Sequence, residues 1–120
     1  MPELSELKRI AEIEYSGIVK SAVIVDYKLR IILREDDGFV EVYLSRKLPD
    51  KFGYHWECQN AQGSLYRYDN FPDKNWQDVT TYPRHFHNGS QENVTASPFP
   101  AAIHEGFRAF MEFIKDKLEA

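Results

Sequence analysis

The last part of the chain carries the clearest pattern for one regular element. Apolar side chains recur there at three- and four-residue spacing: Ile103, Phe107, Phe110, Met111, Ile114 and Leu118. This spacing places them along one side of an α-helix, so we predict an amphipathic helix over residues 101–118. A helix with one apolar stripe has to bury that stripe against a second layer of structure. The rest of the chain must supply that layer.

The first half of the chain has strand patterns. One set of alternate positions in residues 18–34 is mostly apolar: Val19, Ser21, Val23, Val25, Tyr27, Leu29, Ile31 and Leu33. The pattern predicts two strands, or one long bent strand, with a dry face on that side. Asp36, Asp37 and Gly38 form a tight-turn sequence, and residues 39–44 are predicted to be the next strand.

Two further strands are expected at residues 54–58 and 65–69, joined through residues 60–63. A short helix over residues 2–15, ended by Gly17, precedes the strands. The predicted fold class is therefore α+β: an antiparallel sheet of about five strands, with an N-terminal helix and a C-terminal amphipathic helix packed on one face. A length of 120 residues suits a single domain over residues 1–120.

Charge and cysteine content narrow the class of protein. Fifteen basic and 19 acidic residues give a formal net charge of −4, which argues against a general nucleic-acid coat protein but permits a local basic cleft. The single cysteine, Cys58, excludes an intramolecular disulfide and favours a reducing compartment. No apolar run approaches the roughly 18 residues of a membrane span, so we expect a cytoplasmic protein without membrane contact.

The loop of the second hairpin sets its register. Gly63 suits the left-handed third position of a three-residue loop over residues 61–63. That loop pairs Asn60 with Ser64. A loop of two or four residues would turn charged side chains into the core, where unpaired charges are costly.

This register gathers polar side chains on one face of the hairpin. Glu57 lies opposite Arg67, and His55 lies opposite Asp69. The side chains that alternate with them are expected to face the core: Tyr54, Trp56, Cys58, Tyr66 and Tyr68. The four polar residues are either cross-strand charge pairs on a solvated face or part of a functional site.

The segment after the hairpin favours the functional interpretation. Residues 70–99 lack regular periodicity and contain three prolines, with a fourth at position 100. A long irregular stretch in a compact domain is commonly functional. His85 and His87, two residues apart, fall on one side of any extended segment. Three of the four histidines thus lie within residues 55–87.

Several motifs in this region resemble the TumE family. The shared pattern consists of Tyr54-His55-Trp56, Gly63, Arg67-Tyr68-Asp69-Asn70 with Pro72, and Pro83 with His85 and His87. The resemblance runs from about residue 23 to residue 87, with the final helix in the expected place. TumE proteins are small toxins usually encoded beside a helix-turn-helix antitoxin. The resemblance implies the toxin of a toxin–antitoxin pair, with such an antitoxin as partner.

We predict a metal-independent endoribonuclease. Cleavage of RNA through the 2′-hydroxyl needs a base, an acid and a cation near the phosphate. The expected catalytic residues are His55, Arg67, Asp69, His85 and His87. The expected substrate-binding residues are Tyr68, Asn70 and Arg84. This mechanism needs no metal and no cofactor, and its binding partner is RNA.

Two alternatives stay open. A metal-dependent phosphoesterase could hold Zn²⁺ or Mn²⁺ with His85, His87 and Asp69, with or without His55. A non-catalytic module could instead use the same surface, with its aromatic residues, to bind a protein. An exposed edge strand could also support a homodimer by sheet extension.

Overall fold

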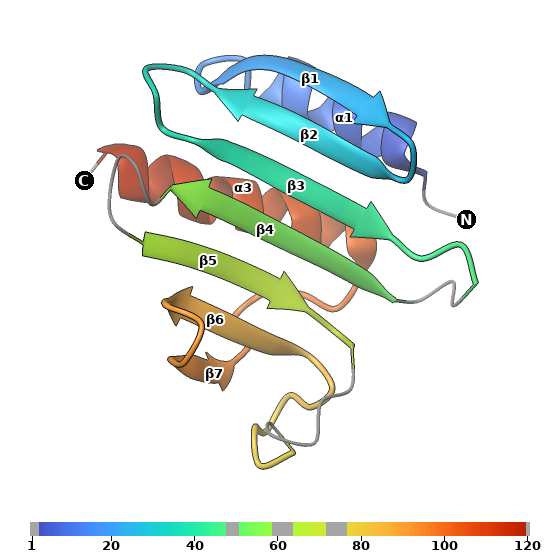
Figure 1. The fold of residues 1–120 in the computed structure, drawn as a ribbon, viewed down its shortest axis with the longest axis vertical. Coiled ribbons are helices and arrows are strands. Elements are labelled where there is room, and N and C mark those ends of the chain that lie inside the picture. Colours follow the sequence, from blue (N-terminus) through green and yellow to red (C-terminus); the bar gives the residue numbers. More distant parts are fainter. Residues whose placement is uncertain (1–2, 48–50, 59–63, 72–76, 120) are drawn as a thin grey trace.

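The fold was obtained as a computed structural model, and the structure describes residues 3–47, 51–58, 64–71 and 77–119. The helices are α1 (Leu4–Glu14) and α3 (Ile103–Glu119). The strands are β1 (Val19–Val25), β2 (Lys28–Leu33), β3 (Phe39–Leu44), β4 (Phe52–Cys58), β5 (Ser64–Asp69), β6 (His85–Gly89) and β7 (Val94–Ala96). They form one antiparallel sheet in the order β1-β2-β3-β4-β5-β6-β7 (Figure 1).

The predicted architecture is confirmed, but the predicted number of strands is too low. Both helices lie on the same face of the sheet, and within the described residues no helix crosses the other face (Figure 1). The described residues form a seven-stranded sheet rather than one of about five strands. The two additional strands, β6 and β7, lie within residues 70–99, which the sequence analysis treats as irregular. β6 contains one large apolar residue, Phe86, and β7 has only three residues, so neither strand carries a long apolar–polar alternation in its sequence.

The strand prediction for residues 18–34 also needs one correction. The first two strands pair across the turn at Asp26 and Tyr27, but the register shifts between Val19 and Ser21. Such a bulge adds one residue to a strand, so it moves every following side chain to the other face. Ser21 and Val23 therefore do not share the dry face with Val19. Val23 is 48% exposed, at the free edge of the sheet.

Aromatic side chains fill the core between the sheet and α3. Tyr54, Trp56 and Tyr68 are fully buried, and the Tyr54 ring packs edge-on against Phe107. Their polar atoms are satisfied at the core boundary: the Tyr54 hydroxyl donates to the Ile103 carbonyl at 2.9 Å. Burying a large apolar side chain contributes about 1.5–3 kcal/mol. The core thus holds β4 and β5 rigidly against the helix, and their polar side chains face the other way.

No helix in the described part of the chain is long and apolar enough to cross a membrane. The Pro2 start expected for the first helix and the Gly63 turn lie outside the described residues.

Candidate functional site

One row of polar side chains crosses the open face of the sheet. Strand pairing aligns Arg30 with Glu41, Glu41 with His55, His55 with Arg67, and Arg67 with His87. Side chains that are paired across neighbouring antiparallel strands point to the same face. The row therefore connects β2 with β6 and brings together groups that are far apart in the sequence.

The register within the β4–β5 hairpin differs from the predicted one by two residues. His55 pairs with Arg67 instead of Asp69, and Cys58 pairs with Ser64. Because side chains alternate with a period of two, this shift keeps every side chain on its predicted face and changes only its partner. The predicted polar face therefore exists, with different neighbours.

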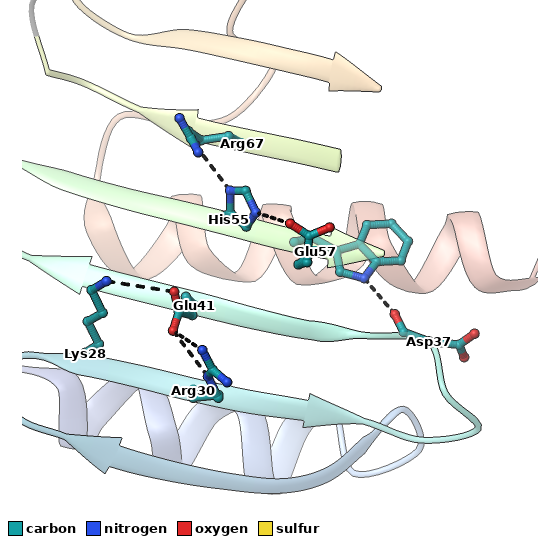
Figure 2. Close-up of polar contacts among 8 residues, drawn as sticks. Lys28, Arg30, Asp37, Glu41, His55, Glu57 and Arg67 are labelled. Carbon is teal, nitrogen blue, oxygen red and sulfur yellow. Dashed lines mark hydrogen bonds and ion pairs between the residues drawn. The ribbon is translucent and has the colours of Figure 1, made fainter. Parts of the chain in front are cut away.

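Arg67, His55 and Glu57 form a connected chain of hydrogen bonds, as Figure 2 shows. Arg67 Nε donates to His55 Nδ1 at 3.2 Å. An imidazole nitrogen that accepts a hydrogen bond carries no proton, so the proton of neutral His55 lies on Nε2. Nε2 faces Glu57 Oε2 at 3.2 Å. The contacts thus set both the tautomer and the position of this histidine.

A second polar group lies beside this chain on β2 and β3. Arg30 Nη2 donates to Glu41 Oε2 at 2.6 Å, and Lys28 Nζ lies 3.9 Å from Glu41 Oε1 (Figure 2). The hydrogen bond from Arg30 lowers the pKa of the Glu41 carboxyl, opposed by its partial burial. Glu41 therefore stays ionised and offsets part of the positive charge on this face.

A pocket of about 320 Å³ opens between these groups. Its lining comprises Lys28, Glu41, Tyr43, Gly53, Tyr54, His55, Arg67, Asp69 and Phe71. In the neighbouring row of the same face, Gly53 pairs with Tyr43 on one side and Asp69 on the other, so this row has one position without a side chain. A glycine within a strand commonly marks a site that another group approaches closely. The missing side chain leaves room for a ligand between the neighbouring strands.

Asp69 connects this pocket to a buried cluster with His85 and His87. Pairing of β5 with β6 places Asp69 opposite His85, and His85 Nε2 lies 3.3 Å from Asp69 Oδ1. His85 is 3% exposed and His87 is 2% exposed, so neither is on the open surface. One ligand atom from each of the three residues lies within 4.8 Å of the others. The two histidines and the carboxylate therefore converge on one small volume.

Backbone carbonyls orient both histidines of the cluster. His85 Nδ1 donates to the Pro83 carbonyl at 3.0 Å, and His87 Nδ1 donates to the Gln91 carbonyl at 2.8 Å. Burial lowers the pKa of His87, partly opposed by its bond to Gln91, so this imidazole is neutral near pH 7. Burial raises the pKa of Asp69, while His85 and the Phe71 N–H act in the opposite direction.

The structure brings together the five expected catalytic residues, but it places one of the three expected substrate contacts on the other face of the sheet. Tyr68 lies on the helix-covered face, fully buried, with its hydroxyl donating to the Pro100 carbonyl at 3.1 Å. Its buried place in the core prevents it from stacking on a base at the open face, so we correct this assignment. Asn70 Oδ1 accepts from the Phe52 N–H, and Arg84 Nη1 donates to the Phe99 carbonyl. Both contacts hold backbone segments together.

Sequence reasoning did not identify Lys28, Glu41 or Gly53 as part of the site. The expected strand begins at residue 54, whereas β4 begins at Phe52 and includes Gly53. A glycine next to a strand pattern was the available signal, since it can mark close approach. Lys28 and Glu41 carried no signal of their own, because charged residues on the wet face of a sheet are ordinary.

The comparisons with known proteins give one match. The family described as Toxin TumE matches residues 4–118, which extends the resemblance noted for residues 23–87 over almost the whole chain. No curated protein and no solved structure matches the chain. The family pattern thus includes both helices and every strand that carries the candidate site. The chain belongs to the Toxin TumE family.

Proposed function

We propose that this toxin-family chain acts by cleaving RNA in the pocket on the open face of the sheet. The observation that supports this proposal is the position of Arg67, whose Nε donates to His55 at the pocket wall. A guanidinium has five N–H donors in a planar fork, and the contact to His55 uses one of them. Arginine in this position is well suited to bind a phosphate group.

The proposed reaction uses the nucleophile that RNA already contains. The 2′-hydroxyl oxygen forms a bond to phosphorus, the bond from phosphorus to the 5′-oxygen breaks, and the products are a 2′,3′-cyclic phosphate and a 5′-hydroxyl. A base has to accept the 2′-hydroxyl proton, and an acid has to protonate the leaving oxygen. This reaction requires no metal ion to generate its nucleophile.

The pocket offers groups for each part of this reaction. Arg67 and Lys28 supply positive charge for the phosphate on two sides of the pocket. His55, with its side chain 21% exposed, is the imidazole at the pocket wall and serves as one proton carrier. The second proton carrier belongs to the Asp69 side of the pocket, where His85 lies behind the carboxylate.

Purified protein and a short labelled RNA provide the test. We expect wild-type protein to cleave the RNA to a 2′,3′-cyclic phosphate and to leave DNA of the same sequence intact, because DNA lacks the 2′-hydroxyl. His55→Gln and Arg67→Ala should each reduce cleavage at least about 100-fold. Arg9→Ala, at an exposed position of α1, is the matched control and should cleave normally. Full cleavage by His55→Gln and Arg67→Ala would rule out this site.

A binding role without catalysis is supported by a different surface. Val25, the last residue of β1, and Tyr27, in the turn that follows it, are 57% and 55% exposed. Exposed apolar residues on an edge strand favour association with a second copy or with an antitoxin. Absence of any RNA turnover, together with tight binding at this edge, would favour the interaction-module alternative. A cytoplasmic site of action accompanies either proposal.

A further inference from the structure

We propose that Asp69, His85 and His87 bind one divalent transition-metal ion of the Zn²⁺ class at the inner end of the pocket. The ligand types are those of known three-residue metal sites, in which two histidines and a carboxylate leave further coordination positions open. The proposal concerns binding by these three side chains and does not depend on RNA cleavage.

The three ligand atoms are already close to the required separation. They lie within 4.8 Å of one another. Bonds of about 2.0–2.1 Å place the ligand atoms of a tetrahedral zinc ion roughly 3.4 Å apart. The His85 Nε2 to Asp69 Oδ1 distance of 3.3 Å already has this value. Binding therefore requires only small side-chain shifts in the remaining pairs.

Hydrogen bonds outside the cluster prepare the histidines to act as ligands. Both Nδ1 atoms donate to backbone carbonyls, of Pro83 and Gln91, so each neutral ring carries its lone pair on Nε2. Metal-binding histidines nearly always have this kind of support on their second nitrogen. Asp69 is supported as well, because its Oδ1 accepts from the Phe71 N–H at 3.1 Å.

The contact between His85 and Asp69 needs a positive charge. Since Nδ1 of His85 already donates to Pro83, a neutral ring presents a lone pair to the Asp69 carboxylate. A lone pair and a carboxylate oxygen repel each other at 3.3 Å unless a cation lies between them. That cation is a proton or a metal ion, and a metal ion also engages His87. Arg67, on the strand beside His87, directs its Nε to His55 instead.

The pocket gives an ion access to this cluster. His85 and His87 are almost fully buried, whereas the Asp69 side chain is 12% exposed and lines the pocket. Asp69 is therefore the ligand that an ion from the pocket would meet first. Because His55 and Arg67 line the same pocket, the ion would add a further positive charge to the site of the proposed phosphate.

The experiment measures binding of Zn²⁺ to purified, tag-free protein by calorimetry and elemental analysis. We expect about one Zn²⁺ per chain for wild type, with Mg²⁺ binding far more weakly because it prefers oxygen ligands. His85→Gln and Asp69→Asn, which change shape little, should each lower Zn²⁺ affinity more than about tenfold. His104→Ala removes a half-exposed histidine on α3 and is the matched control, with unchanged binding.

Two results would overturn the metal site. One is wild-type protein that binds no stoichiometric Zn²⁺, which decides the question even if the variants fail to fold. The other is folded His85→Gln and Asp69→Asn protein, checked by circular dichroism, that binds Zn²⁺ as tightly as wild type. RNA cleavage before and after chelation tests the other proposal separately: cleavage that persists in the metal-free protein supports the metal-independent reaction, and loss of cleavage refutes it.

Discussion

Filling the space above Gly53 should stop the proposed reaction without harming the fold. A Cβ atom added at Gly53 would lie 3.6 Å from Asp69 Cβ, an ordinary van der Waals contact. Gly53→Ala should therefore raise stability by about 0.5–1 kcal/mol, since glycine in a strand is unfavourable. For a chain of this length, that corresponds to a melting temperature roughly 2–5 °C higher.

Gly53→Leu adds a side chain of a volume on the order of 100 Å³, close to a third of the 320 Å³ pocket. The leucine would extend between Tyr43 and Asp69, where we expect the phosphate to bind. Cleavage of labelled RNA should fall at least about 100-fold, and the melting temperature should stay within a few degrees of wild type.

The alanine variant is the control for this experiment, because it shares the backbone change and leaves most of the pocket open. Gly53→Ala should keep at least a tenth of wild-type cleavage. If Gly53→Leu folds normally and cleaves RNA at the wild-type rate, the reaction does not take place in this pocket. If both variants unfold, the position of Gly53 has no room for a side chain, and the reasoning about the pocket is refuted.

Three further predictions concern single residues. Arg67→Lys keeps the charge but loses the planar fork, so RNA cleavage should fall at least about tenfold in a folded protein. Gly106→Ala should lower the free energy of unfolding in urea by about 1–2 kcal/mol. The added Cβ would lie 2.7 Å from the Pro100 carbonyl oxygen, and this overpacking outweighs the gain in helix propensity. The hydrogen bond from Arg30 lowers the pKa of Glu41 below its ordinary 4.5 in the folded protein. Arg30→Ala should therefore lower the free energy of unfolding above about pH 4.5, and this difference from wild type should vanish as the pH falls through the lowered pKa. Urea unfolding of both proteins across this pH range measures the difference.

Local periodicity was sufficient to predict most of the fold. The α3 stripe of Phe107, Phe110 and Met111 was predicted from spacing alone and is buried in the structure. The face of the hairpin that carries His55 and Arg67 was also predicted correctly. The reason is physical: side-chain direction follows from the helical or strand period, and each period repeats within a few residues.

Partners across the sheet could not be obtained in this way. A shift of two residues leaves each side chain on its face, so alternation alone cannot distinguish Asp69 from Arg67 as the neighbour of His55. The bulge after Val19 had a similar effect on β1, because one added residue reverses the faces without a clear mark in the sequence.

The sequence by itself determined two helices, a sheet with one polar face, and the presence of His85 and His87 on one side of their segment. Only the tertiary structure decided that β6 pairs with β5, which brings both histidines to Asp69, and that Gly53 leaves a pocket beside Arg67. Pairing between distant strands depends on how whole surfaces fit together. A glycine can be recognised as part of a pocket only when its neighbours across the sheet are known.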